Sequence, residues 1–106
     1  MSFSPDQIYH QLISAGEDWS DKEAAASLLE ESRKTVLSEL MLSCEGSNAA
    51  RETEALADQK YKEHTKLMVE ARRVANRAKV RWLSVQVLAE ARRTEAATRR
   101  AEMKLA

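Results

Sequence analysis

The feature that most constrains this chain is the stretch from Ala49 to Leu105, which contains neither proline nor glycine. It is dominated by Ala, Leu, Glu, Lys, Arg, Gln and Met, the residues with the highest helix propensities. We therefore predict a single helix over residues 49–104, roughly 84 Å long at 1.5 Å per residue. A helix of this length cannot bury its whole apolar face against the 48 residues that precede it, so another surface must cover the remainder.

A short first helix is predicted over residues 5–15. Ser4 and Gln7 have the spacing of a capping box, and Pro5 stands where its missing N–H costs nothing. Gly16 predicts the end of this helix, because glycine readily adopts the conformation of a C-cap. The apolar residues of this segment share one face at helical spacing: Ile8, Tyr9, Leu12 and Ile13.

A second helix is predicted over residues 21–45. Ser20 and Glu23 repeat the capping-box spacing, and Gly46 predicts the end of the helix. Ser47 can then cap the long third helix. Because the break around Gly46 is short, the second and third helices should be antiparallel neighbours.

These signals together predict an all-α fold built as one helical domain over residues 1–106. A short N-terminal helix precedes a long, coiled-coil-like antiparallel hairpin whose third helix is much longer than the second. The chain has one cysteine, Cys44, and no apolar run of about 18 residues. It also begins without a secretory signal. We therefore expect a cytoplasmic protein without a membrane partner.

A seam of small residues predicts oligomerisation. The second helix, of about 25 residues, reaches only to about Val74 when it packs antiparallel to the third. The first helix can extend this cover a little. Beyond that point the third helix keeps an apolar 3-4 repeat, typical of a coiled coil, which a monomer would leave largely exposed. We expect a homodimer or higher oligomer, most simply with the long helices antiparallel. The predicted interface consists of Ala71, Ala75, Ala78, Trp82, Val85, Leu88 and Ala89.

Charge is divided unequally along the chain. Residues 1–69 carry seven Lys/Arg against thirteen Asp/Glu, a net charge of −6, whereas residues 70–106 carry ten against four, a net charge of +6. Arginines repeated along successive turns can follow a phosphate backbone. The predicted nucleic-acid-binding residues are Arg72, Arg73, Arg77, Lys79, Arg81, Arg92, Arg93, Arg99 and Arg100.

Two alternatives remain open for this basic segment. Its arginines can form ion pairs with the acidic residues of a partner chain, and Glu95 is already placed to pair with Arg99. Trp82 can stack on an unpaired base, or it can fill the seam as a large side chain among small ones.

No pattern in the sequence points to catalysis. His10 and His64 lack the Glu-x-x-His spacing of di-iron bundles, and Cys44 has no partner at metal-binding spacing. No glycine-rich loop is available for a phosphate. We therefore predict a protein that is not an enzyme and that uses no cofactor or metal.

The region from Tyr61 to Ala101 resembles small helical proteins encoded in bacteriophage and prophage genomes. The resemblance lies in Tyr61-x-x-His64, Glu70-Ala71-Arg72-Arg73, Asn76-Arg77-Ala78, Trp82, Glu90-Ala91-Arg92-Arg93 and Arg99-Arg100-Ala101-Glu102. It implies a non-enzymatic accessory protein of a phage, associated with DNA replication or recombination.

Three functions are consistent with these features. The first is a phage-related accessory protein that binds DNA or RNA through the arginine-rich arm. The second is a protein-interaction module, such as an inhibitor or adaptor of a host or phage complex. The third is a purely structural coiled-coil oligomer.

Overall fold

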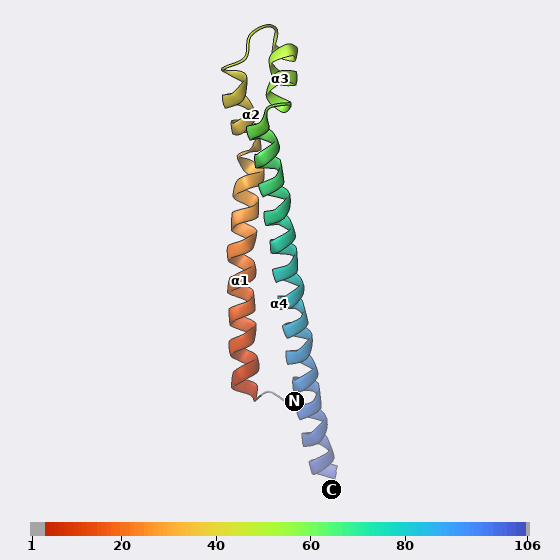
Figure 1. The fold of residues 1–106 in the computed structure, drawn as a ribbon. Coiled ribbons are helices and arrows are strands. Elements are labelled where there is room, and N and C mark those ends of the chain that lie inside the picture. The colour runs from red at the N-terminus through yellow and green to blue at the C-terminus, as the bar shows by residue number, and fades with distance from the viewer. Residues whose placement is uncertain (1–3, 106) are drawn as a thin grey trace. The chain divides into compact units, whose positions relative to one another are not determined.

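The computed structural model describes residues 4–105, which form four helices (Figure 1). The described part contains no strand, so the all-α prediction is confirmed. The helix bounds differ from the predicted ones: α1 Pro5–Glu31, α2 Arg33–Met41, α3 Asn48–Leu56 and α4 Gln59–Leu105.

The helices contribute to two compact units. Unit 1 contains residues 4–20, which are Ser4 and the first part of α1, and residues 76–105, from α4. Unit 2 contains residues 21–75, which include the end of α1, all of α2 and α3, and the start of α4. Each unit therefore packs a segment of α1 against a segment of α4 (Figure 1).

The prediction that a first helix ends at Gly16 and a second begins at Asp21 is wrong. The capping box at Ser4 is present, because Gln7 N–H donates to Ser4 Oγ at 3.2 Å and Ser4 N–H donates to Gln7 Oε1 at 2.9 Å. The helix then continues through Gly16 to Glu31. A Cβ atom at Gly16 would lie 3.2 Å from Trp82 Nε1. This glycine therefore makes room for an indole ring and does not end the helix.

The predicted second helix, residues 21–45, is divided at Ser32. The Ser32 hydroxyl donates to the carbonyl of Leu28 one turn earlier, an interaction that competes with regular helix geometry. The following helix, α2, ends at Met41 and not at Glu45. Gly46 has a φ of 108°, which only glycine adopts readily, and it lies in the loop before α3.

The predicted helix over residues 49–104 is interrupted near its start. Ser47 caps α3 as predicted, accepting a hydrogen bond from Ala50 N–H at 3.2 Å. The chain leaves the helix at Ala57 and Asp58, where Asp58 Oδ1 accepts from Lys60 N–H at 2.7 Å. That local bond gives the backbone an alternative to the helix. From Gln59 onward α4 is continuous, including at Asn76.

The seam of small residues on α4 packs within the chain itself. In unit 2, Ala75 is fully buried, and in unit 1, Ala78 is 3% exposed. Unit 1 also pairs Trp82 with Trp19 of α1, with ring centroids 5.0 Å apart. The prediction that α4 is largely exposed around Trp82 in a single chain is therefore wrong for Trp82, Val85 and Leu88, which are half-buried. The cover at Trp82 comes from Gly16 and Trp19 of α1, which lie between the two helices predicted over residues 5–15 and 21–45.

Candidate functional site

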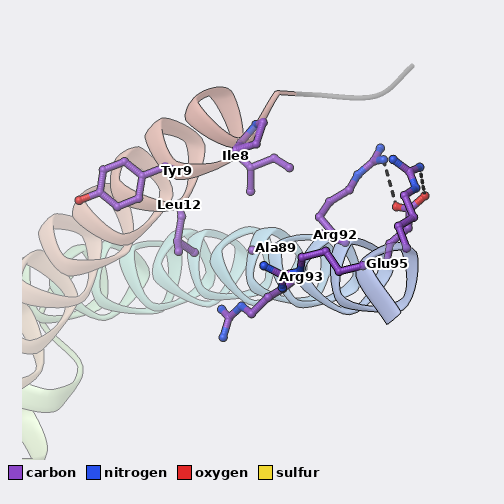
Figure 2. Close-up of a pocket in the computed structure, with 11 residues that line it drawn as sticks. Ile8, Tyr9, Leu12, Ala89, Arg92, Arg93 and Glu95 are labelled. Atoms are coloured by element: carbon purple, nitrogen blue, oxygen red, sulfur yellow. Dashed lines mark hydrogen bonds and ion pairs between the residues drawn. The ribbon is translucent and has the colours of Figure 1, made fainter. Parts of the chain in front are cut away.

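The most distinctive surface of unit 1 is an open groove of about 660 Å³ between the first turns of α1 and the distal part of α4 (Figure 2). We call it the arginine groove. Four arginines and one acid line it together with apolar side chains. Its lining residues are Pro5, Ile8, Tyr9, Leu12, Ala89, Arg92, Arg93, Glu95, Ala96, Arg99 and Arg100.

Side chains of α1 supply much of the apolar lining. Ile8 is buried and Leu12 is half-buried, whereas Tyr9 is 61% exposed. These three residues lie in the first turns of α1, whose start is marked by the Ser4 capping box, and all three line the groove. Ala89 and Ala96 contribute small side chains from α4 and leave the groove open.

The arginines of the groove differ in their partners. Arg92 donates to Glu95 Oε2 at 3.4 Å, and Arg99 donates to Glu95 Oε1 at 3.0 Å, so one carboxylate serves both (Figure 2). The predicted local pairing of Glu95 with Arg99 is confirmed. Arg93 and Arg100 form no ion pair with any residue between 4 and 105. The groove thus carries a net positive charge of three and two arginines available to an anionic group.

Most other predicted nucleic-acid-binding residues already have partners in the chain. Arg72 binds Glu30 with a two-pronged contact, at 2.6 and 2.9 Å, and also donates to Glu23. These hydrogen bonds raise the pKa of Arg72 and lower the pKa of Glu30. Arg73 pairs with Glu70 at 3.4 Å along one helix face.

The predicted residues that follow lie in unit 1. Arg81 donates to Asp18 Oδ2 at 3.2 Å. Lys79 Nζ lies 5.8 Å from the centroid of the Trp19 ring, in the range of a cation–π contact. Arg77 forms no ion pair with any described residue. Of the nine predicted cations, the last four line the arginine groove.

Trp82 occupies a structural position. Its ring is half-buried against Trp19 and close to Gly16. This placement agrees with the alternative in which Trp82 fills the seam. The other predicted interface residues are buried or half-buried within the single chain: Ala71, Ala75, Ala78, Val85, Leu88 and Ala89.

Sequence reasoning missed the contribution of α1 to the groove. Ile8, Tyr9 and Leu12 were recognised as one apolar face, but the helix break assumed at Gly16 separated them from the arginines of α4. The available signal was the continuation of that apolar spacing through Ala15 and past Gly16, to Trp19 and Ala26.

Cys44 follows α2 in unit 2 and is half-buried. Burial, with a smaller contribution from Glu54, raises the pKa of its thiol, which lowers the fraction of reactive thiolate. Among residues 4–105, no group of three His, Cys, Asp or Glu side chains is placed to hold a metal ion.

Comparison with protein-family models, with curated proteins and with solved structures finds no match. Within the described part of the chain, no helix combines the length and the apolar character needed to cross a bilayer.

Proposed function

We propose that the protein is a non-enzymatic helical adaptor that binds an acidic, amphipathic helix of a partner protein in the arginine groove. The observation that supports this proposal is the composition of the groove, in which four arginines and a single glutamate surround an apolar lining. An adaptor of this kind also suits the accessory role that the phage resemblance implies.

The lining of the groove favours a helical ligand. Ile8, Leu12 and Ala89 form an apolar surface that suits side chains spaced three and four residues apart on a partner helix. Arginine binds carboxylates through a planar fork, and arginines at the rim select an acidic partner. Arg93 and Arg100 are available for this role because no described residue neutralises them.

Nucleic-acid binding is the second candidate, and a specific observation favours it. Arg93 and Arg100 are seven residues apart on α4, so they lie two turns apart on one face. Two such arginines can neutralise successive phosphates. A phosphate backbone makes no use of the apolar lining, and for that reason we place this function second.

Fluorescence anisotropy with three labelled probes distinguishes the two candidates. The probes are an amphipathic helical peptide bearing Leu and Glu, single-stranded DNA and double-stranded DNA, each tested at about 50 and 200 mM salt. We expect the peptide to bind more tightly than either DNA. Changing Arg93 and Arg100 to Gln should weaken binding of every probe that uses the groove.

The variant Tyr9→Ser decides between the candidates, because Tyr9 is exposed in the groove and carries no charge. This substitution should weaken binding of the peptide and leave binding of DNA unchanged. Changing Lys62 and Lys66 to Gln is the matched control, since it removes the same charge from exposed positions of α4 in unit 2. Tight, salt-sensitive binding of DNA that is unchanged by Tyr9→Ser would favour the second candidate. Equal binding of the peptide and its scrambled version would overturn the first.

A further inference from the structure

The distal part of α4 carries a second apolar surface, on the side opposite the seam. Val80, Leu83 and Val87 follow the 3-4 spacing of a helix face, and they are 63%, 43% and 67% exposed. Ala78 and Trp82, which alternate with them along the helix, face α1 in unit 1. We call Val80, Leu83 and Val87 the outer stripe.

We propose that the outer stripe binds the same stripe of a second copy of this chain, with the two α4 helices antiparallel. This interface differs from the one predicted from the sequence, because α1 of the same chain already covers the seam. The outer stripe is also independent of the arginine groove, which lies between α1 and α4.

An antiparallel arrangement makes the outer stripe complementary to itself. A two-fold axis that passes beside Leu83 brings Leu83 next to Leu83 of the second copy. It also places Val80 opposite Val87, so the interface contains three apolar layers. Each helix buries the large exposed side chains of the other, which is the main favourable term in association.

Charge selects the antiparallel direction. The same two-fold axis places Glu90 of one copy at the level of Arg77 and Lys79 of the other. Arg77 and Glu90 are exposed, and neither forms an ion pair within residues 4–105. A parallel pair would instead bring Arg77 next to Arg77 and Lys79 next to Lys79, where like charges repel.

The size of the stripe sets the expected strength. Three large apolar side chains per copy are fewer than an obligate interface contains. We therefore expect a reversible dimer with dissociation in the micromolar range, detectable as a molecular mass that rises with protein concentration.

Sedimentation velocity tests the interface. The wild-type chain should shift from monomer to dimer as its concentration rises through the micromolar range. Changing Val80 and Val87 to Ser should raise the dissociation constant by at least about tenfold, because both apolar layers outside Leu83 are lost. Leu28→Ser is the matched control: Leu28 is 67% exposed on α1 in unit 2 and should not alter the equilibrium.

Disulfide trapping tests the direction and the register, in a background where Cys44 is changed to Ser. The chains Val80→Cys and Val87→Cys, one carrying a size tag, should form a disulfide only when mixed. In the proposed register, residue 80 of one chain lies about 10 Å along the helix axis from residue 80 of the second chain, and the same holds for residue 87. That separation is beyond the reach of a disulfide. The proposal would be overturned if either cysteine variant formed a disulfide with itself, or if the mixture of the two did not cross-link. It would also be overturned if the wild-type chain stayed monomeric at about 100 µM.

Discussion

Unit 1 and unit 2 both pack α1 against α4, but different interactions reinforce the packing. In unit 2, polar groups reach from one helix to the other: Arg72 binds both Glu23 and Glu30, and His64 Nε2 donates to the Leu29 carbonyl at 2.9 Å. In unit 1, the two helices are linked by the Trp19–Trp82 ring pair and by an ion pair between Arg81 and Asp18.

The two units also differ in how the arginines of α4 are paired. In unit 2, Arg72 is neutralised by acids of the same chain. In unit 1, Arg81 pairs with Asp18, whereas Arg93 and Arg100 form no ion pair with a described residue. This is why we propose the arginine groove of unit 1, and not unit 2, as the surface that binds another molecule.

The largest effect should come from Trp82→Ala. Removing a large half-buried ring should lower the free energy of unfolding by about 2–3 kcal/mol, less than for a fully buried Trp. Urea unfolding followed by circular dichroism measures the loss. Trp82→Phe should retain part of the stability, and Leu67→Ala, at an exposed position, should retain nearly all of it.

Hydrogen exchange in Trp82→Ala should increase first in residues 5–20 and 76–105. An equal increase throughout residues 21–75 would show that the two units unfold together.

A smaller loss is expected from Arg72→Gln, which removes the contacts to Glu23 and Glu30 in unit 2. The variant should melt several degrees below the wild-type chain, with faster hydrogen exchange confined to residues 21–75. Arg73→Gln is the control because Arg73 is the next residue, loses the same charge and makes only a 3.4 Å surface pair with Glu70. Equal melting temperatures for the two variants would contradict a structural role of Arg72.

The same cluster predicts a dependence on pH. The hydrogen bond from Arg72 lowers the pKa of Glu30 below its ordinary value of 4.5. The stability from this pair is therefore present above pH 4.5 and is lost as the pH falls through the lowered pKa. Thermal melts between pH 7 and pH 3 should show the gap between wild type and Arg72→Gln closing at acid pH. A gap that stays constant would mean that the carboxylate of Glu30 is not the partner that matters.

The smallest effect concerns Gly16. Alanine is favoured over glycine in a helix by about 1 kcal/mol, but its Cβ would lie 3.2 Å from Trp82 Nε1. In the wild-type chain Gly16→Ala should change stability by less than about 0.5 kcal/mol, because the two effects oppose each other. In the Trp82→Ala background the same change should stabilise by about 1 kcal/mol. A double-mutant cycle by urea unfolding measures the difference, and equal effects in both backgrounds would show that the ring does not limit this position.

Local signals in the sequence predicted the helical class and two of the three expected helix starts, those near Pro5 and Asn48. The capping box at Ser4 and the cap at Ser47 involve atoms only a few residues apart, so the sequence itself contains the whole interaction. The seam of small residues on α4 and the clustering of the last four arginines were also visible, because both depend on periodicity along one helix.

The interpretation of Gly16 shows where such reasoning fails. A glycine at a helix end and a glycine beneath an indole ring are the same residue in a sequence, and only the approach of Trp82, sixty-six positions away, separates the two roles. The misplaced break hid the cover that α1 provides for α4, and with it the lining of the arginine groove. Asp58 shows a second limit. The residues around it have high helix propensities, so the sequence predicts a continuous helix there, although a local hydrogen bond from Lys60 N–H to the Asp58 side chain accompanies a break in the structure.

The sequence by itself determined that this chain is helical, where its first helix begins and which face of α4 is apolar enough to pack, because caps and periodicity act over one or two turns. Only the tertiary structure decided what covers that face and which arginines remain unpaired. Those outcomes depend on contacts such as Arg72 with Glu30 and Trp82 with Trp19, whose members are distant along the chain and compete with other possible partners.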